Sequence, residues 1–330
     1  MNIGFTQVLI TIIFLVIFII PGFILAKTGL IGEKADAAFS SLVLYVCQPM
    51  LIFMSFQKTE YNPNVAVNIL IVAVGALVIH LLMIGFVYLV IRNKENSPIK
   101  NCARFASVFS NCGYMGIPFL QSLFGDTNAE VVIYAGMIMA VFNLLNWTFG
   151  VVMITGDRSK ISVKKAILNP NVIAIIAGVA AFMILKTPLK DLAAEGTFAD
   201  DIITRTVKTI DALGNMVTPL SMMVIGIKLA QMKFKDLFTQ KWAYISSAYK
   251  LLVMTAITML IVSFLPIDDL VKYALFFCLS MPSATATALF AVNFGSDGEA
   301  ASVMVLLSTF LSVITIPLLS VLFGFLITLV

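Results

Sequence analysis

Charged residues are scarce in this chain of 330 residues. Asp, Glu, Lys and Arg make up 12% of the sequence, whereas soluble globular proteins average about 25%. Apolar residues make up 60%, against about 45–50% in soluble proteins, and the mean hydropathy is +1.03. This imbalance excludes a water-soluble domain, a disordered chain and a secreted disulfide scaffold.

Residues for metal or catalytic chemistry are equally few. His80 is the only histidine, which excludes a histidine-based metal cluster. The cysteines form no CxxC pair and lie mostly within apolar segments, so they are interpreted as small packed hydrophobes: Cys47, Cys102, Cys112 and Cys278. HExxH, GxSxG and Walker motifs are absent, and no two aspartates lie in mid-span. We therefore expect no enzyme, no cofactor and no metal.

Apolar runs of 18 or more residues recur along the whole chain and predict an all-α polytopic membrane protein. The first run, Val8 to Ala26, is too long for a cleaved signal peptide. At about 20 residues per crossing we expect ten spans. They are approximately 5–26, 37–56, 65–91, 102–124, 130–154, 170–187, 207–230, 242–265, 271–294 and 300–328.

Basic residues lie mainly in the loops between these runs, which indicates topology signals and not a nucleic-acid site. The loops after spans one, three, five and seven hold Lys27, Lys34, Arg92, Lys94, Lys100, Arg158, Lys160, Lys164, Lys165, Lys233, Lys235 and Lys241. The positive-inside rule places these loops in the cytoplasm. Both termini are then expected outside the cell membrane.

A weak internal repeat appears at a shift of 170 residues. The shift overlays Pro49 on Pro219, Ser110 on Ser280, and the pair Phe124-Gly125 on Phe294-Gly295, and it also places His80 on Lys250. Chance similarity between apolar helices is the alternative. An inverted repeat of five plus five spans is a transporter architecture. It predicts repeats at 1–154 and 170–330, joined by a cytoplasmic linker at 155–169.

Spans four and nine are expected to be broken. Span four contains Ser110-Asn111-Cys112-Gly113-Tyr114-Met115-Gly116-Ile117-Pro118, and span nine contains Ser280-Met281-Pro282-Ser283-Ala284-Thr285. Glycine and proline disfavour a continuous helix, and interruptions at corresponding places in two halves indicate a binding site. Two proline kinks packed by small residues are the alternative. The predicted substrate-binding residues are Asn111, Cys112, Gly113, Tyr114, Pro118, Met281, Pro282, Ser283 and Thr285.

Four further polar residues are candidates because they lie inside apolar spans. Gln48 and Thr218 precede the mid-helix prolines of spans two and seven, where a plain kink is the alternative. Lys250 lies about 13 Å and His80 about 18 Å from the cytoplasmic ends of their spans. A lysine at that depth costs about 2.5–3.5 kcal/mol on insertion scales. It can attract an anion, exchange a proton, or simply bind backbone carbonyls.

The segment from Asn111 to Pro118 resembles the N-x-x-x-M-G-I-P sequence of the auxin efflux carrier family, which includes plant PIN-like carriers and bacterial organic-acid permeases. Supporting matches are Gln48-Pro49, Asn169-Pro170, Pro282, Leu307-Ser308-Thr309 and Ile316-Pro317-Leu318. The family's usual proline before the asparagine is Ser110 here. The long cytoplasmic loop of plant members is absent, and so is a clear match for their acidic support residue.

This resemblance implies a fold like that of bile-acid symporters and sodium/proton antiporters. Spans one, two, six and seven would form a scaffold. Spans three to five and eight to ten would form a moving transport domain in which the broken spans four and nine cross. The resemblance also places Asn111 on the family's substrate-contacting asparagine.

We therefore expect a secondary transporter for a small organic anion, such as a carboxylate, working by an elevator-like movement in the lipid bilayer. A coupling proton or sodium and a homodimer are further expectations. A cation/proton antiporter is one alternative, although no carboxylate lies deep in a span among Glu33, Asp36, Glu60, Asp126, Glu130, Asp211 and Asp297. A non-transporting membrane receptor is the other.

Overall fold

The computed structural model describes residues 4–329 except 33, 94, 126, 232–236 and 238, and it leaves the Lys190 side chain undescribed. Five charged residues used in the topology and carboxylate arguments therefore lie outside the described residues: Glu33, Lys94, Asp126, Lys233 and Lys235.

The first half of the chain is helical. Its elements are α1 (Phe5–Lys27), α2 (Ala35–Leu42), the π-helical turn η1 (Val43–Cys47), α3 (Gln48–Lys58), α4 (Pro63–Val90), α5 (Pro98–Val108), the π-helical turn η2 (Cys112–Gly116), α6 (Ile117–Phe124), α7 (Glu130–Leu145), the π-helical turn η3 (Asn146–Gly150) and α8 (Val151–Thr155). The local sequence determines where helices such as α4 begin. The Asn62 side chain accepts a hydrogen bond from the backbone of Asn64 and caps α4, and Pro63 occupies the first turn, where a missing N–H costs nothing.

The second half is helical as well. Its elements are η4 (Arg158–Lys160), α9 (Val163–Ile167), α10 (Pro170–Leu185), η5 (Leu189–Asp191), α11 (Phe198–Asn215), α12 (Val217–Gln231), α14 (Lys241–Ala248), the π-helical turn η6 (Tyr249–Met254), α15 (Thr255–Ser263), α16 (Asp269–Ser280), α17 (Ala286–Asn293) and α18 (Gly298–Leu329). Asn169 caps α10 as Asn62 caps α4, again with proline next in sequence.

Within the described residues, seven helices are long and apolar enough to cross a membrane, or eight if the bent pair Arg158–Ile167 and Pro170–Leu185 is one span. Large apolar side chains cover the outer faces of several of them, with Phe14 61%, Leu89 72% and Phe310 65% exposed. Such faces require lipid. The chain is a polytopic membrane protein. The remaining two expected spans, four and nine, are each divided into two short helices, α5–α6 and α16–α17.

Equivalent helix pairs of the two halves pack in the same way. Between the halves, α1 packs along α12 and α10 packs along α3. Within the halves, α4 packs on α7 in the first and α14 packs on α18 in the second. The α1–α12 contact is very close because Gly22 lies against the Met223 backbone and Gly226 lies against the Ile19 backbone. Small residues allow such close approach between membrane helices.

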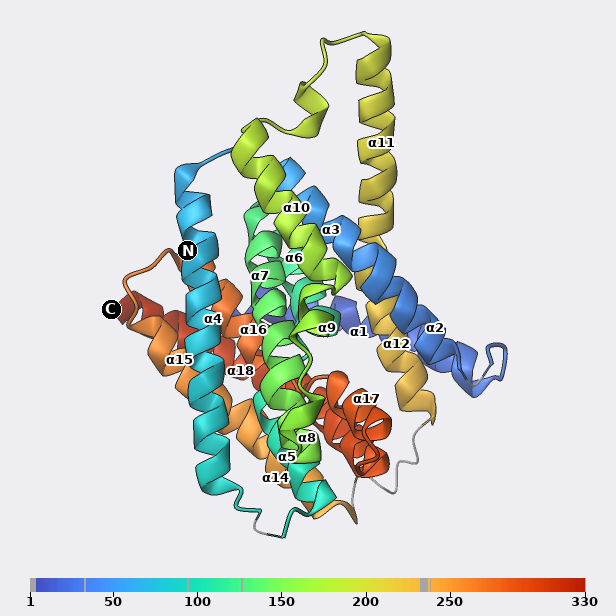
Figure 1. Ribbon diagram of the computed structural model, residues 1–330, viewed down its shortest axis with the longest axis vertical. Helices are drawn as coiled ribbons and strands as arrows, with labels where there is room; N and C mark the ends of the chain where they lie inside the picture. The colour runs from blue at the N-terminus through green and yellow to red at the C-terminus, as the bar shows by residue number, and fades with distance from the viewer. Residues whose placement is uncertain are drawn as a thin grey trace.

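Loops of alternate spans lie at the same end of the bundle. At the lower end of Figure 1, the loop after α4 lies near the start of α14, and Lys100 stacks over Trp242 there. At the upper end, the end of α3 meets the connection after α10, where Lys186 stacks over Tyr61. The helix α11 projects beyond its neighbours at this upper end.

Candidate functional site

The two broken segments meet at their breaks. Residues 109–111 follow α5, residues 281–285 follow α16, and together they are called the crossing below. The backbone N–H of Asn111 donates to Pro282 O at 2.8 Å, and that of Ala284 donates to Phe109 O at 2.8 Å. These two bonds form an antiparallel bridge between Ser110 and Ser283. Both interruptions expected from proline and glycine are therefore present, and they satisfy part of each other's freed backbone.

Serine hydroxyls bind other freed backbone groups at the crossing. Ser283 Oγ donates to Ala106 O at 2.8 Å, and its backbone N–H donates to Ser308 Oγ at 3.0 Å. Ser110 Oγ donates to Leu279 O at 2.8 Å. A helix leaves its last four carbonyls without intrahelical partners, so these bonds remove part of the cost of ending two helices inside the membrane. In this conformation Ser283 holds the crossing together.

Lys250 reaches the crossing from η6 and is fully buried. Its Nζ donates to Ser110 Oγ at 2.6 Å, to Leu279 O at 2.9 Å and to Val108 O at 3.2 Å. An ammonium group has three N–H donors, so all three are used by neutral protein oxygens. This burial agrees with the position inside a span that the sequence predicts, and the depth in the membrane stays a prediction. The prediction that Lys250 itself contacts an anion stays a prediction, because here its donors are occupied.

Asn111 lies at the start of η2, is 3% exposed, and its side-chain Nδ2 has no hydrogen-bond partner in the structure. The backbone carbonyl of the same residue accepts from Met115 and Gly116, so Asn111 caps the second half of the broken span. A buried amide donor without a partner costs about 1–3 kcal/mol. Such a group is a ready binding group for a ligand oxygen.

Gln48 on α3 forms hydrogen bonds both to η2 in the first half of the chain and to α10 in the second half. Its Nε2 donates to Gly113 O at 2.6 Å, and its Oε1 accepts from Asn171 Nδ2 at 3.3 Å. A Cβ on Gly113 would lie 3.2 Å from the Gln48 amide nitrogen, so glycine permits this approach. The structure therefore places the predicted residue Gln48 against η2, just after the crossing, where it binds the backbone of η2 and a side chain of α10.

Two more predicted residues bind across the same region. Tyr114 donates from its hydroxyl to Ser40 O at 3.3 Å, and Thr218 Oγ1 donates to Gln121 Oε1 at 3.1 Å. Gln121 in turn donates to Asn215 Oδ1 at 3.3 Å. These bonds join η2 and α6 to α2, α11 and α12.

The remaining predicted residues near the crossing contribute to packing and to the backbone conformation. Cys112 and Met281 are buried, and Pro118 occupies the first turn of α6. Pro282 gives its carbonyl to Asn111, as described above.

His80 lies beside the crossing on α4. Its ring packs against that of Phe109 with centroids 6.1 Å apart, and Nδ1 bonds to Ala76 O at 2.7 Å. A carbonyl accepts only, so Nδ1 carries the proton. The other ring nitrogen, Nε2, is buried without a partner. His80 and Lys250, which the internal repeat pairs, thus both approach residues 108–110 from helices of different halves.

A cavity of about 430 Å³ opens beside the crossing between α2, α12, α17 and α18. Thr285, just before α17, lines it, and Asp36, Lys228 and Glu299 contribute charged groups. The charges of Lys228 and Asp36 interact with each other. Sequence reasoning missed Lys228. The signal was available, because Lys228 falls inside the expected span 207–230, but its position near the end of that span resembles an ordinary interface lysine.

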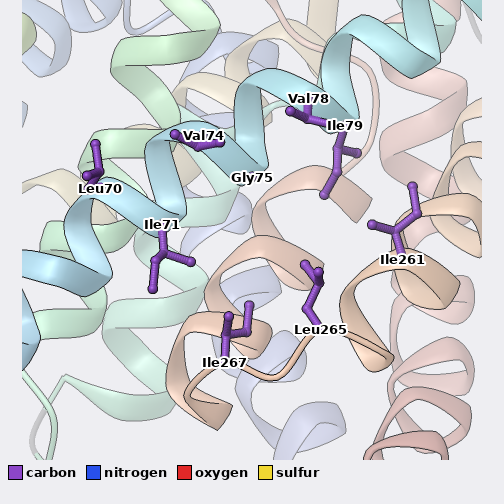
Figure 2. Close-up of a pocket in the computed structure, with 9 residues that line it drawn as sticks. All are labelled: Leu70, Ile71, Val74, Gly75, Val78, Ile79, Ile261, Leu265 and Ile267. Atoms are coloured by element: carbon purple, nitrogen blue, oxygen red, sulfur yellow. The ribbon is translucent and has the colours of Figure 1, made fainter.

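A second hollow is unsuited to a polar ligand. Figure 2 shows aliphatic side chains of α4 facing those of α15 and the following turn. It measures about 420 Å³, and its lining consists of Leu70, Ile71, Val74, Gly75, Val78, Ile79, Ile261, Leu265 and Ile267. The site for a polar ligand is better placed at the crossing and the adjoining charged cavity.

Comparison with known proteins gives concordant matches along nearly the whole chain. A family described as membrane transport protein matches residues 7–320. An "Uncharacterized transporter" of Methanocaldococcus jannaschii is 21% identical over 310 residues, covering 93% of this chain and 96% of that protein. Another of Methanothermobacter thermautotrophicus is 24% identical, covering 94% and 97%. A protein of Rhizobium meliloti named "Putative malonate transporter" is 23% identical, covering 86% and 85%.

Proposed function

The chain belongs to the membrane transport protein family, and from that premise we propose that it is a secondary transporter of a small organic anion. The observation that carries the proposal is the charge at the crossing. When protonated, Lys250 brings a positive charge there, and its three donors bind only neutral oxygens. An anion is the ligand that would balance this charge.

The helix termini at the crossing are also consistent with a positive net charge of the site. Each terminus of a helix carries about half an elementary charge, positive at the amino end and negative at the carboxyl end. Two carboxyl ends, of α5 and α16, and two amino ends, of η2–α6 and α17, lie at the crossing. Their partial charges cancel to about zero, so the charge of Lys250 is left as the net charge of about +1. A monoanion at the two amino ends neutralises the site.

The proposed binding groups follow from the geometry. Asn111 Nδ2 offers a free donor, and Thr285 lies at the amino end of α17 where the charged cavity begins. Backbone N–H groups at the start of η2, around Cys112 and Gly113, add donors for a carboxylate. Lys250 acts on the anion through its field. Gln48, Tyr114 and Thr218 hold the broken helix in place, and His80 packs against Phe109 of the crossing.

The proposed mechanism is an elevator movement of one part against the other. The scaffold consists of α1–α3 and α10–α12, and the transport domain consists of α4–α8 and α14–α18. Reciprocal packing of α1 with α12 and α10 with α3 supports two inverted repeats of five spans each. The proposed boundary passes through the cavity, which has Asp36 and Lys228 on one wall and Thr285 and Glu299 on the other.

A carboxylate is the proposed substrate class, because amino ends of helices and amide donors are typical carboxylate partners. The relative named as a malonate transporter supports this class. The location is the cell membrane, with both termini outside. The two alternatives, a cation/proton antiporter and a non-transporting receptor, predict different results in the following test.

The test is purified protein in liposomes on a solid-supported membrane, exposed to a panel of mono- and dicarboxylates at fixed pH. We expect a saturable current or tracer uptake for at least one carboxylate. Liposomes holding the Asn111→Ala variant are the control, and their response to that acid should fall at least tenfold. Responses to cations with none to any acid would overturn the proposal, and so would binding without uptake.

A further inference from the structure

The ammonium of Lys250 occupies a place built from helix ends. Two of its partners, Val108 O and Leu279 O, belong to the last turns of α5 and α16, whose carbonyls lack intrahelical partners. The third, Ser110 Oγ, itself donates to Leu279 O. The carboxyl ends of both broken helices therefore converge on one buried cationic atom.

The charges match in magnitude as well as in sign. Each carboxyl end carries about −0.5 elementary charge, so two ends offer about −1 to the single positive charge. The net charge of about +1 at the site is then carried by the two amino ends, where the anion is proposed to bind. In transporters with broken helices, unwound carbonyls and carboxyl ends of half-helices are the groups that coordinate a coupling sodium. Here a lysine side chain holds that position.

The irregular backbone around Lys250 helps to position its side chain at the crossing. Lys250 lies in the π-helical turn η6, and its own carbonyl accepts from Thr255 Oγ1, five residues ahead, at 3.1 Å. π-helical turns are frequent at functional sites. The lysine is therefore fixed by the irregular helix behind it and by three hydrogen bonds in front of it.

We propose that Lys250 is a tethered cation: its ammonium permanently fills a cation site between the carboxyl ends of α5 and α16, so the transporter works without sodium at the crossing. This inference rests on the proposed function, since it names the ion requirement of that site. The ligand class of the vacated site is a small monovalent cation, organic or inorganic.

The first experiment uses the wild-type protein. Its melting temperature and its uptake of the best carboxylate are measured in sodium chloride and in choline chloride at equal ionic strength. We expect both quantities to be the same in the two salts. A sodium-dependent rise in melting temperature, or uptake that requires sodium, would overturn the proposal.

The second experiment empties the site. Lys250→Ala removes the charge and leaves space, whereas Lys250→Met removes the charge and fills the space with an apolar stem. Propylammonium chloride is the probe, because it has the three carbons and the nitrogen that alanine lacks. We expect it to raise the melting temperature of Lys250→Ala saturably and to restore at least half of the stability lost, through binding to the folded state. It should leave wild type and Lys250→Met unchanged.

Equal shifts in all three proteins would indicate non-specific binding and contradict the tethered cation. A Lys250→Ala protein as stable as wild type would contradict it too. If this variant does not fold, the sodium comparison on wild type decides alone. The melting experiments need no substrate, so they stand even if no carboxylate is transported; failure of the proposed function and failure of this inference are therefore separable.

Discussion

The side chain of Asn111 offers a donor that the protein itself does not use. We predict that Asn111→Ala weakens carboxylate binding at least tenfold, or about 1.4 kcal/mol. Stability should hold or rise, because Nδ2 has no protein partner to lose and a buried donor without a partner itself costs free energy. Isothermal titration with the best substrate and thermal melting of the same preparation check the two parts of this prediction.

The matched control is Asn101, another buried asparagine of the same broken segment. Its Nδ2 donates to Asn96 Oδ1 at 2.8 Å, and its Oδ1 accepts from Asn93 Nδ2 at 2.9 Å. Asn101→Ala should therefore lose about 1–3 kcal/mol of stability and keep its affinity for substrate. If both variants lost affinity equally, Asn111 would have no special role in binding.

Single residues show clearly what could be predicted from sequence. That Lys250 lies inside a span follows from counting residues along an apolar helix, and the structure buries its side chain fully. Its partners do not follow, because Val108 and Ser110 lie 142 and 140 residues away in the chain. Lys228 was missed because the same count places it close to a helix end. What it faces depends on how α12 lies across the charged cavity from α17 and α18.

At the scale of helices, the tight contact between α1 and α12 predicts that its glycines cannot be replaced by residues with a side chain without loss of stability. A Cβ on Gly226 would overlap the backbone oxygen of Ile19, and backbone cannot move aside as a flexible side chain can. We predict that Gly226→Ala costs about 1–3 kcal/mol of stability, as overpacking does. Thermal melting in detergent measures it.

Gly85 provides the comparison on α4. A Cβ there meets nothing within 4 Å, and the position is exposed. Gly85→Ala should be neutral or stabilising by up to about 1 kcal/mol, because alanine favours the helix. Equal losses in both variants would remove close packing as the explanation for Gly226.

The broken helices illustrate how far local sequence determines an element. Proline and glycine in spans four and nine were sufficient to predict that each helix is interrupted. In span nine Pro282 lies at the break, but in span four the break at residues 109–111 precedes the glycines and the proline, which lie in η2 and α6. The bridge between the breaks needed the structure, since backbone bonds between residues 109–111 and 282–284 carry no side-chain signature. The π-helical turns were likewise unpredictable, because an extra residue in a helix leaves the apolar pattern almost unchanged.

At the scale of the whole molecule, loop charge predicts orientation. We expect alkaline phosphatase fused after residue 330 to be active in a bacterial host, because the carboxyl terminus would lie outside. A fusion within residues 156–162, next to Arg158 and Lys160, should be inactive and its green fluorescent counterpart bright. The reverse pattern in both fusions would place the basic loops outside and contradict the assignment.

An elevator movement makes a further demand on the whole molecule: bonds across the boundary between scaffold and transport domain must break in every cycle. Thr218 on α12 and Gln121 on α6 form such a bond, at 3.1 Å. We predict that a disulfide formed by oxidising the pair Thr218→Cys and Gln121→Cys abolishes transport, and that reduction restores it. The native cysteines are all buried, which limits competing reactions.

The control disulfide lies within the scaffold. Lys58 on α3 and Asp211 on α11 form an ion pair at 2.6 Å near the upper end of the bundle. Because α3 and α11 would move together, cross-linking Lys58→Cys to Asp211→Cys should leave the initial rate of carboxylate uptake within about twofold of the reduced protein. Uptake that survives the first cross-link, or stops with the second, would show that the moving boundary lies elsewhere. The difference between the two pairs thus tests the movement itself, independently of which carboxylate is carried.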